Sequence, residues 1–171
     1  YITTGLLTAT DKDKKIKRQT IMNRNVGYLV FLAAGVVVTL VFLLFPTQIY
    51  ESIRYFDGGY SNELYNHGIY DTFALITVLL AWGLAVVYYY VINSVKFDRW
   101  PHWLIMLMAA LIISPSACFG YNKYVFNEYG LTYLGESLQM AICHVLFALI
   151  MFVVASFSIR WWSSNCRHSP F

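Results

Sequence analysis

The sequence predicts an all-α integral membrane protein, a bundle of four transmembrane helices with both termini in the cytoplasm. The first observation is composition, because 58% of the residues are hydrophobic and only 12% are charged. A soluble domain carries about 25% charged residues, so this chain has more apolar surface than a soluble core can bury. The second observation is length: 171 residues hold four spans of about 20 residues each and leave no room for a second domain. The third is the sorting of Lys and Arg onto one side.

Four apolar stretches without any Asp, Glu, Lys or Arg predict the transmembrane domain, which we place at residues 26–159. They cover about residues 26–45, 72–93, 103–119 and 138–159. The first is longer than the apolar core of about 7–15 residues in a signal peptide and lacks a small-residue cleavage site, so we expect it to remain in the mature protein. The third is the shortest, and Pro115 predicts that its last turn bends or unwinds.

Basic side chains sort onto one side of the predicted membrane. Ten of the twelve Lys and Arg residues lie in the N-terminal segment (residues 1–25), in the loop after the second span and in the C-terminal tail (residues 160–171): Lys12, Lys14, Lys15, Lys17, Arg18, Arg24, Lys96, Arg99, Arg160 and Arg167. Only Arg54 and Lys123 lie on the other side. This bias predicts that the basic side is cytoplasmic, and the short loops favour a bacterial inner membrane. The N-terminal basic run either anchors this orientation or binds anionic lipid headgroups.

Aromatic side chains gather at the ends of the spans on the same basic side. They are Tyr88, Tyr89, Tyr90, Trp100, Trp103, Trp161 and Trp162. Tyr and Trp favour the membrane interface, so these positions agree with the predicted orientation.

The longest connection, residues 46–71, carries a tyrosine at every fifth position. These are Tyr50, Tyr55, Tyr60, Tyr65 and Tyr70. One interpretation is an outer surface on which a partner docks. The other is a layer of tyrosines at headgroup depth that caps the bundle. Asp57-Gly58-Gly59 predicts a turn between two short helical arms in this connection.

His144 is the one side chain well inside an apolar span that titrates near neutral pH. An ionisable residue inside a membrane is a candidate functional site, which here means protonation, ligation or the lining of a water path. The alternative is a neutral ring that hydrogen-bonds to a neighbouring helix. The third span ends in polar residues at a similar depth, so we expect contacts to His144 from Ser114, Ser116 and Cys118.

Small residues recur at helix-packing spacing in every span. The pairs in the first three spans are Gly35 with Thr39, Thr77 with Ala81 and Ala85, and Ala110 with Ser114. The fourth span has the longest stripe, which also contains the histidine: Ser137, Ala141, His144, Ala148 and Ala155. Such faces let helices approach closely in lipid. We expect this stripe to face protein or a pore rather than lipid.

Catalytic signals are weak throughout the chain. No nucleotide-binding, zinc-protease or serine-hydrolase motif occurs, a second intramembrane histidine for haem is missing, and Cys118 with Cys143 is the one conceivable thiol pair. We therefore expect no cofactor, no metal, no catalytic residue and no nucleic-acid partner, and we expect membrane lipid and either copies of the chain or another membrane protein as partners. The leading interpretation is a subunit of a homo-oligomeric pore or ion channel. The alternatives are a non-catalytic accessory or assembly subunit of a larger membrane complex and, less well supported, a small membrane redox enzyme.

Overall fold

The computed structural model describes the backbone of residues 3–56 and 59–169, and the side chains of residue 22 and residues 24–56 and 59–169. All regular structure within these residues is helical. Four of the described helices are long and apolar enough to cross a membrane, at Arg24–Leu44, Ile69–Ile92, Trp100–Glu128 and Leu134–Trp162. This confirms the all-α class with four candidate spans, whereas the cytoplasmic placement of the termini stays a prediction.

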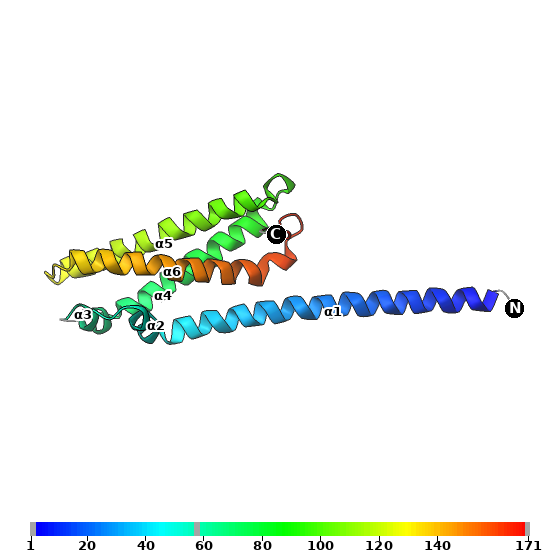
Figure 1. Ribbon diagram of the computed structural model, residues 1–171, viewed down its shortest axis with the longest axis horizontal. Coiled ribbons are helices and arrows are strands. Elements are labelled where there is room, and N and C mark those ends of the chain that lie inside the picture. The colour runs from blue at the N-terminus through cyan, green and yellow to red at the C-terminus, as the bar shows by residue number, and fades with distance from the viewer. Residues whose placement is uncertain (1–2, 57–58, 170–171) are drawn as a thin grey trace.

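The longest helix, α1 (Thr3–Leu44), joins the basic N-terminal segment and the first span in one continuous rod. Its N-terminal half projects past the end of the bundle (Figure 1). Pro46 then begins the short helix α2 (Pro46–Ile53), where a residue without an N–H fits because the first turn of a helix leaves that donor unused. A second short helix, α3 (Tyr60–Asn66), completes the connection. Asp57 and Gly58 of the predicted turn lie outside the described residues.

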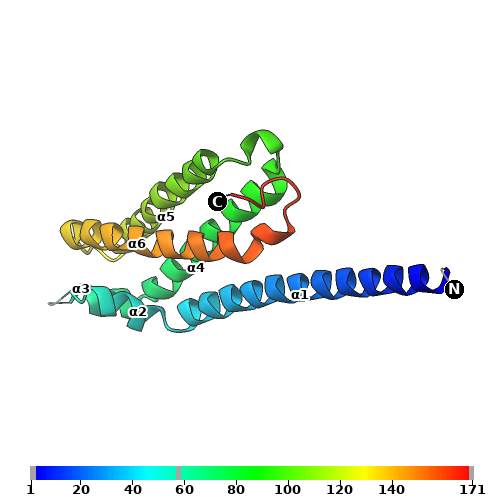
Figure 2. The ribbon, with the colours of Figure 1, turned by 45° about the vertical axis from the view of Figure 1, so that its right-hand side comes forward.

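Three helices form the body of the molecule. They are α4 (Ile69–Val86), which continues into the π-helix η1 (Val87–Ile92), α5 (Trp100–Glu128) and α6 (Leu134–Ile159), which ends in the short 3-10 turn η3 (Arg160–Trp162). A second 3-10 turn, η2 (Val95–Phe97), lies between η1 and α5. Both views place α1 along one side of this body, next to α6 (Figures 1 and 2).

The helix that carries the third predicted span extends beyond its apolar run. We placed that span at about residues 103–119 and expected its last turn to bend or unwind at Pro115, but α5 continues as a helix through Pro115 to Glu128. Proline removes one backbone donor, and a membrane helix tolerates this loss where neighbouring groups pack around the site. Pro115 is buried in the bundle, so the helix continues into the polar region beyond the apolar run.

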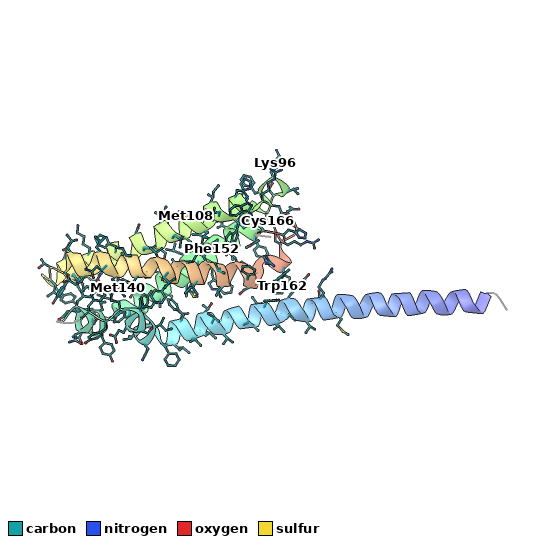
Figure 3. All side chains as sticks on the ribbon, viewed as in Figure 1. Lys96, Met108, Met140, Phe152, Trp162 and Cys166 are labelled. Atoms are coloured by element: carbon teal, nitrogen blue, oxygen red, sulfur yellow. The ribbon has the colours of Figure 1, made fainter. Side chains whose placement is uncertain are left out.

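Side chains of α6 fill the space between the helices. Met140 and Phe152 are 2% and 0% exposed and lie among the side chains that separate α6 from its neighbours (Figure 3). Met108 of α5 is 49% exposed and projects from the outer side of the bundle in the same view. The core is therefore centred on α6, and the outward faces of α5 and α1 are apolar surface.

The C-terminal tail is fixed to the end of α4 by Asn93. The Asn93 side chain accepts hydrogen bonds from Ser163 Oγ and from the Asn165 backbone N–H, both at 3.0 Å, and donates to Ser164 Oγ at 2.9 Å. Asn93 also has a positive φ of 30°, a conformation that asparagine adopts more readily than most residues. The tail therefore packs back against the chain at the end where both termini lie (Figure 1).

Two tyrosines expected at the membrane interface are buried under this tail. Tyr88 and Tyr89, both in the π-helix, are 1% and 0% exposed. Their hydroxyls lie 3.0 Å from Ser169 Oγ and 3.1 Å from the Ser169 carbonyl oxygen. Sequence alone placed these rings at the interface because it gave no sign that the tail returns to cover them. Tyr90 remains 43% exposed.

Candidate functional site

Four side chains from three other helices surround the buried ring of His144 in α6. His144 Nδ1 lies 3.0 Å from the Tyr50 hydroxyl of α2. Its Nε2 lies 2.8 Å from Thr77 Oγ1 of α4, 3.2 Å from Ser114 Oγ and 3.3 Å from Cys118 Sγ, the last two from α5. All five residues are 2% exposed or less. We call this group the histidine cluster.

The hydrogen bonds of Thr77 determine which nitrogen of His144 carries the proton. Thr77 Oγ1 lies 2.6 Å from the carbonyl oxygen of Phe73, and a carbonyl only accepts, so the threonine proton is used there. Thr77 Oγ1 must therefore accept from His144, which places the ring proton on Nε2. Nδ1 is then an acceptor, and the Tyr50 hydroxyl donates to it. Burial raises the pKa of Tyr50 and keeps this phenol protonated.

Aromatic rings enclose the rest of the imidazole. Tyr50 stacks on it with ring centroids 5.7 Å apart and planes 14° apart, while Phe73 and Phe147 approach edge-on at 5.8 and 6.4 Å. Both ring nitrogens are therefore partnered, and the His144 side chain is 0% exposed. This arrangement suits a polar link between α2, α4, α5 and α6 better than proton exchange with water, because a proton could reach the ring only if the bundle opened.

Ser116 does not belong to the histidine cluster. Ser114 and Cys118 are four residues apart and share one face of α5, whereas Ser116 lies two residues from each and points to the opposite face. It is exposed, while Ser114 and Cys118 are each 1% exposed. The structure thus brings two of the three expected contacts to His144.

The small-residue stripe of α6 is covered by the chain's own helices. Ser137, His144, Ala148 and Ala155 are buried, and Ala141 is half-buried. Each packs within a single copy of the protein, since the contacts of α6 are with α5, α4 and α1. If this stripe lined a pore between copies, the helices that cover it in one chain would have to move away.

The five tyrosines of the outer connection do not form one surface. Tyr50, Tyr60 and Tyr70 are 2% exposed or less, whereas Tyr55 and Tyr65 are 55% and 68% exposed. The buried rings pack on core aromatics, as in the pair of Tyr50 and Phe147 with centroids 4.4 Å apart. Because α2 and α3 pack over the end of the bundle away from the termini (Figure 1), three of the predicted docking residues are core residues. Only Tyr55 and Tyr65 remain available to a partner.

A second polar group at the outer end was missed from sequence. Asn122 of α5 is fully buried and donates to Tyr60 Oη at 2.7 Å and to Ser137 Oγ at 3.0 Å. Burial raises the pKa of Tyr60 to about 12. Asn122 lies beyond the apolar run that marked the third span, so no signal in the sequence distinguished it from an exposed loop residue.

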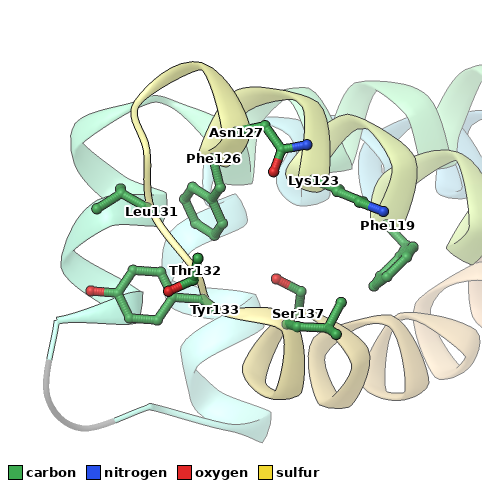
Figure 4. Close-up of a pocket in the computed structure, with 9 residues that line it drawn as sticks. Phe119, Lys123, Phe126, Asn127, Leu131, Thr132, Tyr133 and Ser137 are labelled. Atoms are coloured by element: carbon green, nitrogen blue, oxygen red, sulfur yellow. The ribbon is translucent and has the colours of Figure 1, made fainter.

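A hollow of about 220 Å³ lies beside this group, between the end of α5 and the start of α6 (Figure 4). Phe119 and Lys123 project toward it from α5, one helical turn apart. Its other lining residues are Phe126, Asn127, Leu131, Thr132, Tyr133, Leu134 and Ser137. The hollow is mainly apolar, with a single cationic side chain among its lining residues.

The cysteines do not form the thiol pair that a redox enzyme would use. Cys118 is a free thiol beside His144, while Cys143 is a free, half-buried thiol that lines a shallow surface crevice with Arg54, Gln139 and Ile142. Across the part of the chain that the structure describes, no three His, Cys, Asp or Glu side chains are grouped to hold a metal ion.

In comparisons with known proteins, no family model, no curated protein and no solved structure matches the chain.

Proposed function

We propose that the protein is a non-catalytic accessory or assembly subunit that joins a larger membrane complex through α1. The observation that carries this proposal is the weak attachment of α1 to its own chain. Its apolar span contacts the bundle along a narrow stripe that includes Gly35, Thr39 and Phe42, all buried. Leu32 and Leu43 are half-buried against the core. Most other apolar side chains of the span are exposed, among them Leu29, Val30, Phe31, Val37, Val38, Leu40, Val41 and Leu44.

The projecting half of α1 supports the same proposal. Lipid alone can cover the exposed part of a single span, but α1 continues past the bundle as a helix (Figure 1). An isolated helix is marginal in water, and most helices in proteins are stabilised by packing. A partner that packs along this rod would stabilise it in the same way.

The histidine cluster supports a non-catalytic role. Its one titratable imidazole is 0% exposed and has a hydrogen-bond partner at each nitrogen. A general acid or base must reach its substrate directly or through one water. The cluster meets that requirement poorly, whereas it is well placed to fix four helices relative to one another.

The second candidate is a subunit of a homo-oligomeric pore or ion channel. The exposure of α1 favours it, because copies arranged around an axis could cover the free face of this helix. The lining would then have to come from α1, since the α6 stripe is occupied inside each copy. The exposed α1 side chains are apolar, so such a pore would close by dewetting rather than through a polar filter.

In either case we propose a bacterial inner-membrane location with both termini in the cytoplasm. The support is the distribution of Lys and Arg, of which ten lie on the side of the termini and two on the other. Fusing a reporter that is active only in the cytoplasm to each terminus, and to the 46–71 connection at Tyr65 of α3, would test the orientation.

Site-specific photocrosslinking in cells, combined with the mass of the purified protein in nanodiscs, tests the functional proposal. A crosslinker at Val37 of α1 reports on the proposed interface, and one at Ile112 of α5 is the control, because the two side chains are 58% and 61% exposed. We expect Val37 alone to crosslink to another polypeptide and the purified chain to be monomeric. Crosslinks between copies with a discrete oligomeric mass would favour the pore, and equal crosslinking from Ile112 would contradict an interface on α1.

A further inference from the structure

We propose that a crevice between α1 and the C-terminal segment binds the phosphate group of an anionic phospholipid. This inference goes beyond the proposed function and does not depend on it. The crevice has a volume of about 560 Å³ and is lined by Arg24, Asn25, Tyr28, Leu29, Trp161, Trp162, Ser163 and Arg167. That volume lies within the range of about 300–1,000 Å³ that is typical of small-molecule sites.

Charge is the first argument for a phosphate ligand. Arg24 and Arg167 line the crevice from its two sides, and the lining contains no Asp or Glu. Across the described residues, neither guanidinium forms an ion pair with a carboxylate. Arg167 Nε donates to His168 Nε2 at 3.2 Å, which uses one of the five N–H donors of that group. Guanidinium groups match the geometry of phosphate oxygens and bind them in a bidentate manner.

A third guanidinium strengthens the positive potential at this place. The Arg160 Cζ atom lies 4.1 Å from the ring centroid of Trp161, a crevice residue, and 4.6 Å from that of Phe157. Stacking on these rings holds its charge next to the crevice. Basic pockets between transmembrane helices are characteristic sites for phospholipid headgroups.

Depth is the second argument, and it identifies a lipid as the source of the phosphate. The apolar run of α1 begins two residues after Arg24, and Trp162 ends the last candidate span, so the crevice lies where two spans end together. Trp162 lies beside α1 at this level (Figure 3). Lipid phosphates occupy the same level of a bilayer, where Trp and Tyr are favoured.

The aromatic wall of the crevice is the third argument. Tyr28 stacks on Trp161 with ring centroids 5.1 Å apart and planes 10° apart, and it meets Trp162 edge-on at 6.3 Å. Leu29, at the same end of α1, is 57% exposed. The site thus combines guanidinium groups for the phosphate with apolar rings and an exposed leucine for the glycerol and acyl chains. A soluble phosphate would use only the first of these.

Native mass spectrometry of the purified full chain, titrated in detergent with phosphatidylglycerol or phosphatidylcholine, tests the proposal. We expect preferential binding of phosphatidylglycerol to the wild type. The double variant Arg24→Gln/Arg167→Gln should bind it about 25-fold more weakly, or about fivefold per guanidinium. The matched control is Lys96→Gln/Arg99→Gln, which removes two exposed charges at the same end of the bundle but outside the crevice, and it should bind like the wild type.

Three results would overturn the proposal. Equal losses in the two double variants would indicate diffuse surface charge, and no loss in either would show that the crevice does not bind the lipid. Displacement of phosphatidylglycerol by an equal concentration of inorganic phosphate would identify a free phosphate ion as the ligand instead. Thermal unfolding checks that each variant is folded. If the double variant is not, the single variants Arg24→Gln and Arg167→Gln take its place, and binding unchanged in both would reject the site.

Discussion

The first and last spans have almost the same hydropathy but very different surroundings. The mean hydropathy of the most apolar 18-residue stretch is 2.6 in α1 and 2.5 in α6. Of these stretches, 17% is buried in α1 and 44% in α6. Hydropathy thus identifies which segments can enter a membrane and says nothing about which of them pack together. In lipid this is expected, because apolar side chains gain little by leaving acyl chains for a protein interior.

Small and polar residues account for the difference between the two helices. In α6 the stripe from Ser137 to Ala155 continues along the whole span and includes His144, whose ring is hydrogen-bonded to three neighbouring helices. In α1 the corresponding stripe is short, with Gly35 and Thr39 as its small members. Thr39 accepts a hydrogen bond from Trp82 Nε1 at 3.1 Å. Close approach and interhelical hydrogen bonds therefore determine packing in this bundle.

The largest effect should come from removing the imidazole of the histidine cluster. His144→Ala leaves the buried Tyr50 hydroxyl without its acceptor and opens a cavity among four helices. An unsatisfied buried polar group costs about 1–3 kcal/mol, and with the cavity we expect the free energy of unfolding to fall by about 3 kcal/mol. Unfolding in mixed micelles, followed by circular dichroism, measures this change.

Ile142→Ala is the matched control for this variant. Ile142 is also in α6, two residues from His144, but it is 66% exposed, so its removal should change the stability by less than about 0.5 kcal/mol. Equal losses of stability in the two variants would contradict the claim that the histidine cluster holds the helices together. A His144→Ala variant as stable as the wild type would contradict it as well.

The second effect in size should follow from enlarging a small residue of the α6 stripe. Ala155 is 0% exposed, so Ala155→Leu forces a larger side chain into a filled space and should destabilise the bundle by about 2 kcal/mol. The variant Val37→Leu introduces the same residue at an exposed position of α1, where Val37 is 58% exposed, and it should leave the stability unchanged. Melting temperatures of the two variants in one detergent compare them directly. Similar values would contradict the claim that α6 is tightly packed at Ala155 while α1 is exposed at Val37.

Much of the fold could be predicted from sequence because a membrane imposes simple rules on it. Twenty-residue apolar runs and the small-residue pairs are local signals, and every small residue of those pairs is buried apart from the half-buried Ala141. The end of α5 was missed because its last turns are polar and leave the apolar run. The return of the tail onto Asn93 was missed because it depends on contacts between residues about 70 positions apart.

The histidine cluster was only partly foreseeable. His144 stood out as an ionisable residue inside a span, and Ser114 and Cys118 followed from the depth at which the third span ends. Tyr50 looked like one of five equivalent loop tyrosines, and only the packing of α2 against the bundle brings its hydroxyl to Nδ1. Spacing along the chain carries no information about such a contact between distant segments.

The smallest effect should come from the close approach of α1 to α6 at Gly35. A Cβ atom on Gly35 would collide with Ser158 Oγ and lie 2.8 Å from Ser158 Cβ, so Gly35→Ala should cost about 1 kcal/mol of stability. Gly27→Ala is the control on the same helix, because nothing lies within 4 Å of a Cβ there. It should be neutral, or stabilise the protein by up to about 1 kcal/mol through its higher helix propensity.

A double-mutant cycle with Ser158→Gly separates the collision from other effects of Gly35→Ala. Ser158→Gly removes both atoms that a Cβ on Gly35 would meet, so the double variant should be more stable than the sum of the single changes implies, by about 1 kcal/mol. Additive changes would mean that α1 and α6 do not approach closely at this point. In that case α1 would be held mainly by its ends, at the stack of Tyr28 on Trp161 and the packing of Phe42 on Phe147.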